Sequence, residues 1–194
     1  MNKKSFIIIA LAFAIGCFLG YSYEKNTYNK SPNISSTVNT NKAIKKYTLI
    51  KFMNIQMGMS YDQVKQILGD GVKDTNALDA SPIQQYYIWE NNDGSSIRVT
   101  FVSNRAIYKE QDNLDNSFKF NITKKQFDKI QRGMTYSQVK EILLVDGQLI
   151  KQYGSWQTNN TGSELYEWYN INKSYISILF KNGKVSSRYE ENLK

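Results

Sequence analysis

The sequence has no histidine and only one cysteine, Cys17, among its 194 residues. With a single cysteine the chain cannot form an intramolecular disulfide. Without histidine it lacks a usual zinc ligand and the base of Ser/His and Cys/His catalytic pairs. Neither a glycine-rich phosphate loop nor a calcium-loop spacing is present. We therefore predict no catalytic residues, no metal site and no cofactor, and a protein that is not an enzyme.

Proline is also scarce, with two residues, whereas Tyr, Phe and Trp together make up 13% of the chain. Aromatic residues favour strands, and few prolines interrupt them, so the composition predicts a β-rich globular protein. The chain has a mass of 22.5 kDa and is 41% hydrophobic. That is enough to bury the cores of two small domains.

Positive charge is unevenly distributed along the chain. The formal net charge of +8 divides into +6 for residues 1–46, −3 for residues 47–117 and +5 for residues 118–194. Nucleic-acid binding requires basic residues gathered on one surface, which this distribution does not indicate. A nucleic-acid partner is therefore not expected, and binding of an anionic ligand by the basic second half stays a lesser alternative.

The N-terminal segment predicts export. Lys3 and Lys4 precede an uncharged run from Ser5 to Tyr23. This run is long enough for a signal peptide and of borderline length for a membrane-spanning helix. We predict that residues 1–23 are a signal peptide or membrane anchor and that the rest lies on the extracytoplasmic face of the cell membrane.

Cys17 lies within this apolar run, directly after Gly16. The "AIGC" sequence resembles the bacterial lipobox, whose cysteine is lipidated, so Cys17 is a candidate lipidation site. The alternative is an apolar cysteine in an uncleaved helix, and both alternatives tether the protein to the membrane. Residues 24–46 are rich in Asn, Ser, Thr and Lys, which predicts a disordered linker.

The remaining sequence contains an internal duplication. Residues 48–68 and 123–143 are identical at 12 of 21 positions, which indicates that one structural unit is present twice. We predict repeats at residues 47–117 and 118–194.

The repeated words "GMSYDQV" and "GMTYSQV" contain helix signals. We predict that Gly58 ends one helix, that Ser60 caps the next and that Gln63 completes its capping box. The second repeat supplies the same three signals: Gly133, Thr135 and Gln138.

Strands follow the helices in each repeat. "QYYIWE" aligns with "ELYEWY" and "SIRVTF" with "YISILF", both at a spacing of 79 residues. Alternation directs one set of side chains toward the helices, namely Trp89, Phe101, Trp168 and Phe180. The predicted fold class is α+β, a tandem repeat of two helix-helix-four-strand units, with antiparallel sheets and the helices on one face.

The same alternation predicts a binding surface on the sheet face opposite the helices. Tyr and Arg are favoured at protein interfaces. The alternative is that the side chains predicted on this face reflect strand propensity, or that they pack against the linker, the neighbouring repeat or a second copy. The predicted partner-binding residues are Tyr86, Ile88, Arg98, Tyr169, Tyr175, Leu179, Lys181 and Arg188.

In each repeat the helix signal "GM[ST]Y..VK.IL" is followed by a Tyr/Trp strand and then by a strand that ends in Phe. This order resembles the tandem-repeat β-lactamase inhibitory proteins and related Gram-positive lipoproteins. A similar unit occurs in the small lipoproteins of the outer-membrane barrel-assembly machinery. The resemblance implies two units side by side whose sheets form a concave surface that grips another protein. The structural disulfides of the inhibitors have no counterpart in a chain whose only cysteine is Cys17.

These observations predict a non-catalytic, membrane-tethered protein-binding module outside the cytoplasm. Its partner is expected to be another extracytoplasmic protein. The alternative is a structural lipoprotein that supports assembly of a cell-envelope complex. Inhibition of a β-lactamase is a less favoured possibility.

Overall fold

The computed structural model describes residues 45–74, 83–115, 117, 119–154 and 162–194. These residues belong to one compact unit, Ala43–Lys194. The predicted anchor, Cys17 and all but the end of the predicted linker lie outside the described residues. Within the described ranges, no helix has the length and apolar character needed to cross a membrane.

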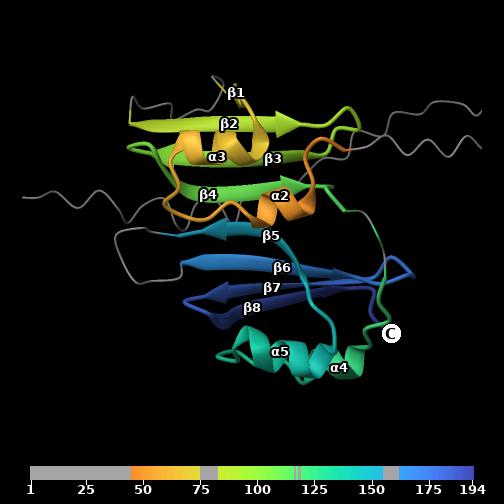
Figure 1. The fold of residues 1–194 in the computed structure, drawn as a ribbon. Helices are drawn as coiled ribbons and strands as arrows, with labels where there is room; N and C mark the ends of the chain where they lie inside the picture. The colour runs from red at the N-terminus through yellow and green to blue at the C-terminus, as the bar shows by residue number, and fades with distance from the viewer. Residues whose placement is uncertain (1–44, 75–82, 116, 118, 155–161) are drawn as a thin grey trace, which may run out of the picture. The chain divides into compact units, whose positions relative to one another are not determined.

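Among the described residues, two helices are followed by four strands, and this order occurs twice (Figure 1). The first set is α2 (Leu49–Met53), α3 (Tyr61–Leu68), β1 (Val72–Lys73), β2 (Gln84–Glu90), β3 (Ser96–Val102) and β4 (Arg105–Asp112). The second set is α4 (Lys124–Asp128), α5 (Tyr136–Leu143), β5 (Gln148–Tyr153), β6 (Ser163–Tyr169), β7 (Tyr175–Lys181) and β8 (Lys184–Glu191).

The predicted fold class, an α+β tandem repeat of two helix-helix-four-strand units with antiparallel sheets, is wrong. The eight strands of the described residues form one antiparallel sheet in the order β1-β2-β3-β4-β5-β6-β7-β8. The described helices are short, with five residues in α2 and α4 and eight in α3 and α5. The structure is therefore mostly sheet, and its helices are small additions to it.

The two sets of strands are joined where β4 pairs with β5. Tyr108 lies opposite Tyr153, and Glu110 lies opposite Lys151. Two separate sheets would each leave a row of unpaired backbone groups at this edge, and such edges invite pairing with another strand. Pairing of residues 108–110 of β4 with residues 151–153 of β5 covers part of both edges within one chain.

The predicted helix caps are confirmed, but the predicted helix ends are wrong. Ser60 and Gln63 form a capping box at α3, and Thr135 and Gln138 form one at α5. Helices α2 and α4 end five residues before the repeated glycines. Gly58 instead lies in a turn with a φ of 87°, a conformation that favours glycine. Its N–H donates to the carbonyl of Ala106 at the start of β4.

Two hydrophobic clusters fill the space between the helices and the sheet. Helices α2 and α3 pack on the first cluster with β2–β4, and α4 and α5 pack on the second with β6–β8. The four side chains predicted to face the helices are at most 1% exposed, as expected: Trp89, Phe101, Trp168 and Phe180.

A buried asparagine ties each pair of helices to the sheet. Asn91 accepts a hydrogen bond from the N–H of Tyr47 (2.9 Å) and donates to the Tyr47 carbonyl (2.8 Å). Asn170 makes the same two bonds with Ile122, at 2.7 and 2.8 Å. Because buried polar groups need partners, these amides fix the segment that enters each first helix.

Candidate protein-binding surface

The face of the sheet that points away from the two hydrophobic clusters is called the outer face here. Successive side chains of a strand point to opposite faces, so the neighbours of Trp89 and Phe101 lie on the outer face. The buried side chains of the four described helices all belong to the clusters on the other face. No described helix therefore covers the outer face.

A continuous row of side chains crosses the outer face from β2 to β8. Glu110 makes two ion pairs within this row: one carboxylate oxygen lies 3.3 Å from Arg98 Nη1 and the other 3.4 Å from Lys151 Nζ. Tyr108 Oη also donates to Glu110. The register defines this central row as Ile88, Arg98, Glu110, Lys151, Leu165, Leu179 and Ser187.

A second row beside the central row is rich in tyrosine. Cross-strand pairing links Tyr86 to Thr100, Thr100 to Tyr108 and Tyr108 to Tyr153. The Tyr86 hydroxyl accepts a hydrogen bond from Gln84 Nε2 at 2.6 Å. These phenols present large apolar rings with polar tips, a combination common at interfaces.

Three tyrosines on β6, β7 and β8 form what we call the tyrosine ladder. The ring centres of Tyr169 and Tyr175 are 5.8 Å apart, and those of Tyr175 and Tyr189 are 5.9 Å apart. Tyr169 Oη donates to Glu167. Burial raises the pKa of Glu167 and of Tyr169, and it raises the pKa of Tyr175 to about 12. The phenols of Tyr169 and Tyr175 are therefore neutral hydrogen-bond donors at ordinary pH.

The register places seven of the eight predicted binding residues on the outer face. Ile88, Arg98 and Leu179 belong to the central row, and Tyr169 and Tyr175 to the ladder. Leu179 is only 9% exposed, so it offers little contact area. The other two are Tyr86 and Lys181.

Arg188 is the exception, and its predicted orientation is wrong. A register shift between Leu179 and Phe180 changes the alternation of β8, so Arg188 lies opposite the buried Ile178 on the helix face. Its guanidinium donates to the carbonyl of Phe127 and lies 4.4 Å from the centre of that ring. Arg188 thus packs against α4.

Sequence reasoning missed several residues of the outer face. Alternation within "IYKEQ" could have indicated Tyr108 and Glu110. Lys151 and Tyr153 gave no such signal, because their place depends on the pairing of β5 with β4. Tyr189 was missed because the register shift changes the alternation of β8, which is also why Arg188 was assigned to the wrong face.

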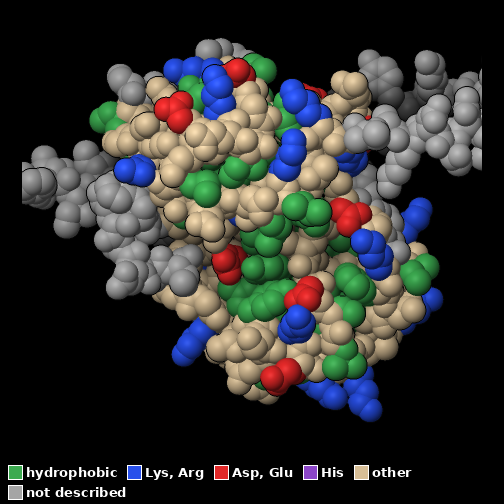
Figure 2. All heavy atoms as spheres, viewed as in Figure 1, with side chains coloured by type: hydrophobic (Ala, Val, Ile, Leu, Met, Phe, Trp, Pro, Cys, Tyr) green, Lys and Arg blue, Asp and Glu red, His purple; other side chains and the backbone are tan. Residues whose placement is uncertain are grey.

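The helix face has a hollow of about 270 Å³ where the two halves of the sheet meet. Figure 2 shows hydrophobic side chains gathered over the middle strands, between the positions of α2 and α5 in Figure 1. The hollow is lined by Met53, Ile55, Gln56, Met57, Lys109, Leu149, Gln152, Glu164 and Tyr166.

Internal contacts account for the two charged groups of this hollow. Lys109 Nζ donates to the carbonyls of Phe52 (3.2 Å) and Ile55 (2.7 Å). Glu164 accepts a hydrogen bond from Gln152 Nε2 at 3.0 Å. Burial lowers the pKa of Lys109 to about 8 and raises that of Glu164. Lys109 thus ties the end of α2 to β4, whereas Glu164 links β6 to β5 through Gln152.

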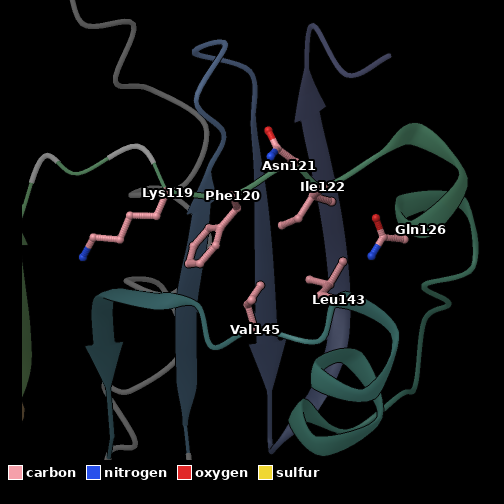
Figure 3. Close-up of a pocket in the computed structure, with 7 residues that line it drawn as sticks. All are labelled: Lys119, Phe120, Asn121, Ile122, Gln126, Leu143 and Val145. Atoms are coloured by element: carbon pink, nitrogen blue, oxygen red, sulfur yellow. The ribbon is translucent and has the colours of Figure 1, made fainter.

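A smaller pocket of about 190 Å³ lies between the segment before α4 and the end of α5 (Figure 3). Ile122 and Leu143, which line it, belong to the second hydrophobic cluster. Gln126 belongs to the capping box of α4 and donates to the carbonyl of Ile142. The pocket is therefore part of the scaffold of the second half.

The outer face presents side chains that are suited to binding. Across the described ranges, no three acidic or cysteine side chains are grouped so that they could hold a metal ion. The outer face combines phenols, an arginine, lysines and carboxylates on one continuous sheet. Such a surface can form hydrogen bonds and aromatic contacts with another macromolecule.

Comparison with known proteins places this fold in a family. No curated protein sequence matches the chain. A crystal structure of a candidate beta-lactamase inhibitor protein from Streptococcus mutans is similar, with a TM-score of 0.58 and 21% identity over 75% of this chain and 95% of that one. The sequence profile of the family described as "Beta-lactamase inhibitor (BLIP)" matches residues 48–168. This match covers more than half of the chain and confirms the resemblance noted from the repeats, and the chain belongs to the β-lactamase inhibitor (BLIP) family.

Proposed function

We propose that this chain is a non-catalytic protein that binds another protein through the outer face of its sheet. The observation that carries the proposal is the concentration of tyrosines around the Arg98–Glu110–Lys151 group on a face that no described helix covers. Tyrosine and arginine are enriched among the residues that dominate binding energy at interfaces. A solvated sheet face would more commonly carry small polar and charged residues.

Family membership supports a protein as the partner. The family takes its description from inhibition of β-lactamases, which gives one class of enzyme to test. The two hollows described above lie beside helices rather than on the outer face. A broad, shallow surface fits a folded protein better than it fits a small molecule.

We further propose that the protein is held at the outer side of the cell membrane. The support is the sequence of the N-terminal segment, in which Lys3 and Lys4 precede the uncharged run from Ser5 to Tyr23. Metabolic labelling with a fatty-acid analogue would distinguish the two forms of anchor. Label that disappears in Cys17→Ser indicates a lipoprotein, whereas unlabelled protein that stays in the membrane fraction indicates an uncleaved helix. A soluble cytoplasmic pool of the full-length protein would contradict both.

A pull-down of the full-length protein from membranes of the native cell tests the binding function. The expected result is one extracytoplasmic protein that is recovered by the wild type and reduced by Tyr86→Ala or Tyr169→Ala. Purified β-lactamases tested in parallel by inhibition of hydrolysis would show whether such an enzyme is that partner. Recovery that is the same for both variants and the wild type would remove the outer face as the binding surface.

A further inference from the structure

β8 is the last strand of the sheet, and one of its two edges has no other described strand beside it. In the first set of strands, the corresponding edge of β4 is paired. β8 ends the strand order, with only β7 beside it among the described strands. Its counterpart in the first set, β4, is paired on both sides because β5 lies along its second edge. The duplication therefore shows what the edge of β8 is shaped to accept, an antiparallel strand.

The segment before α5 covers only the beginning of this edge. Val185 exchanges backbone hydrogen bonds with Gly133 and Met134, and Thr135 bridges to Lys184. Ala106 of β4 exchanges the corresponding backbone hydrogen bonds with Gly58 and Met59, and β5 covers the edge beyond it. In β8 the edge from Ser187 to Glu191 faces no other described strand.

The side chains of this segment are complementary to a second copy of themselves. In a two-fold antiparallel pair centred on Tyr189, Arg188 of each copy lies opposite Glu190 of the other. The symmetry therefore gives two such pairs of opposite charge. Centring the pair on Arg188 or on Glu190 would instead place like charges opposite each other, which is unfavourable. Charges on an edge strand usually discourage pairing, but these charges attract in one register. They would do so in addition to their contacts within each copy, where Arg188 donates to the Phe127 carbonyl and Glu190 accepts from the Leu193 N–H.

The tyrosine ladder supports the same register. Tyr189 is the outermost ring of the ladder and is 54% exposed, although it lies on β8 beside two partly buried tyrosines. In the register centred on Tyr189, its ring meets Tyr189 of the second copy. The two ladders then join into one row across both outer faces.

We propose that two copies of this chain pair along Ser187–Glu191 of β8, antiparallel and centred on Tyr189, to form one continuous sixteen-stranded sheet. A head-to-tail arrangement, with β1 of one copy on β8 of the next, fits less well because β1 has only two residues. Five residues per strand bury less area than a standard interface, so the pairing is expected to be weak in dilute solution.

Disulfide cross-linking of full-length protein carrying Cys17→Ser tests the register, because an introduced cysteine is then the only thiol. Opposite residues of an antiparallel pair have Cα atoms about 4.5–5.5 Å apart, within disulfide range. Tyr189→Cys should therefore form a cross-linked dimer on oxidation. Ser187→Cys is the matched control: the two Ser187 positions would be four residues, or about 13 Å, apart along the strands. It should cross-link only when mixed with Glu191→Cys.

Charge exchange provides an independent readout of the same pairing. Glu190→Arg should lower the Tyr189→Cys cross-linking yield about tenfold, because it places like charges opposite each other twice. Adding Arg188→Glu should restore the yield, provided that the melting temperature of the double variant shows a folded protein. Equal cross-linking of Tyr189→Cys and Ser187→Cys, absence of cross-linking by Tyr189→Cys, or loss of yield without rescue in a folded double variant would each overturn the proposal.

Discussion

Lys109 donates a hydrogen bond to the carbonyl of Phe52 at 3.2 Å, and its ammonium lies 4.7 Å from the centre of the Phe52 ring. A single side chain thus satisfies a carbonyl near the end of α2 and packs a cation on an aromatic face. Arg188 has the same relationship with Phe127 and α4. Both halves therefore have a cation that bonds to a helix carbonyl and packs on an aromatic ring. The two cations differ in exposure: Lys109 is 2% exposed, whereas Arg188 is exposed.

The buried Lys109 should make stability rise with pH. Burial disfavours the ammonium form, so the folded protein has a Lys109 pKa of about 8, against 10.5 normally. Between these values the unfolded chain binds more protons, and the free energy of unfolding increases with pH. We expect a gain of about 1–2 kcal/mol between about pH 8 and 9.5, measured by urea unfolding.

A methionine in place of Lys109 should remove this pH dependence, because it keeps the length of the side chain without a titrating group. Lys181→Met, at an exposed site on β7, is the control and should keep the wild-type slope. The measurements stay below about pH 10, where tyrosines such as Tyr175 begin to contribute with the opposite sign because their pKa is raised. If the free energy of unfolding of Lys109→Met rose with pH as steeply as that of the wild type, Lys109 would not be the cause of the pH dependence.

The two buried asparagines should contribute strongly to stability. Asn91→Ala would leave the N–H and carbonyl of Tyr47 without their partner, and an unsatisfied buried group costs about 1–3 kcal/mol. We expect Asn91→Ala and Asn170→Ala to lose about 2–4 kcal/mol each in urea unfolding. Asn121→Ala, at an exposed site, should stay within about 0.5 kcal/mol of the wild type.

Gly71 and Gly147 are expected to be required for their small size. A Cβ atom at either position would lie 2.6 Å from the indole ring of Trp89 or Trp168. Because each indole is buried and fixed by a hydrogen bond to a carbonyl, it has little room to move. Gly71→Ala and Gly147→Ala should each cost about 1–3 kcal/mol and change the tryptophan fluorescence. An unchanged melting temperature would show that the indoles can shift.

The sequence predicts local features of this fold well because their partners are close in the chain. A capping box joins residues three positions apart, so Ser60 and Gln63 identified the start of α3. Alternation along a strand likewise identified Trp89 and Phe101 as core residues. In contrast, the helix ends assigned to Gly58 and Gly133 were wrong, because a glycine with positive φ marks a turn without saying which element precedes it.

Features that depend on distant pairing were not predictable. Nothing near β4 indicates that it pairs with β5, so the single continuous sheet was missed. An irregularity in β8 changes which face each later side chain joins, and one such shift moved Arg188 from the predicted outer face to the helix face. The Arg98–Glu110–Lys151 group of the candidate surface was also not predictable. Glu110 and Lys151 meet only because β4 pairs with β5.

Substitutions on the outer face provide the decisive test of the proposed function. With the partner recovered by the pull-down, Tyr86→Ala, Arg98→Ala and Tyr169→Ala should each weaken binding by about 1–2 kcal/mol, or about 5- to 30-fold in Kd. The reason is that each change removes contact area or a hydrogen-bonding group from a rigid surface. Glu141→Ala, at an exposed site on α5, is the control and should bind as the wild type does. All variants should keep the wild-type melting temperature, so that a loss of binding reports on the surface. Losses at two or more of the three sites support the outer face, whereas a loss confined to the helix control would place the binding site beside the helices.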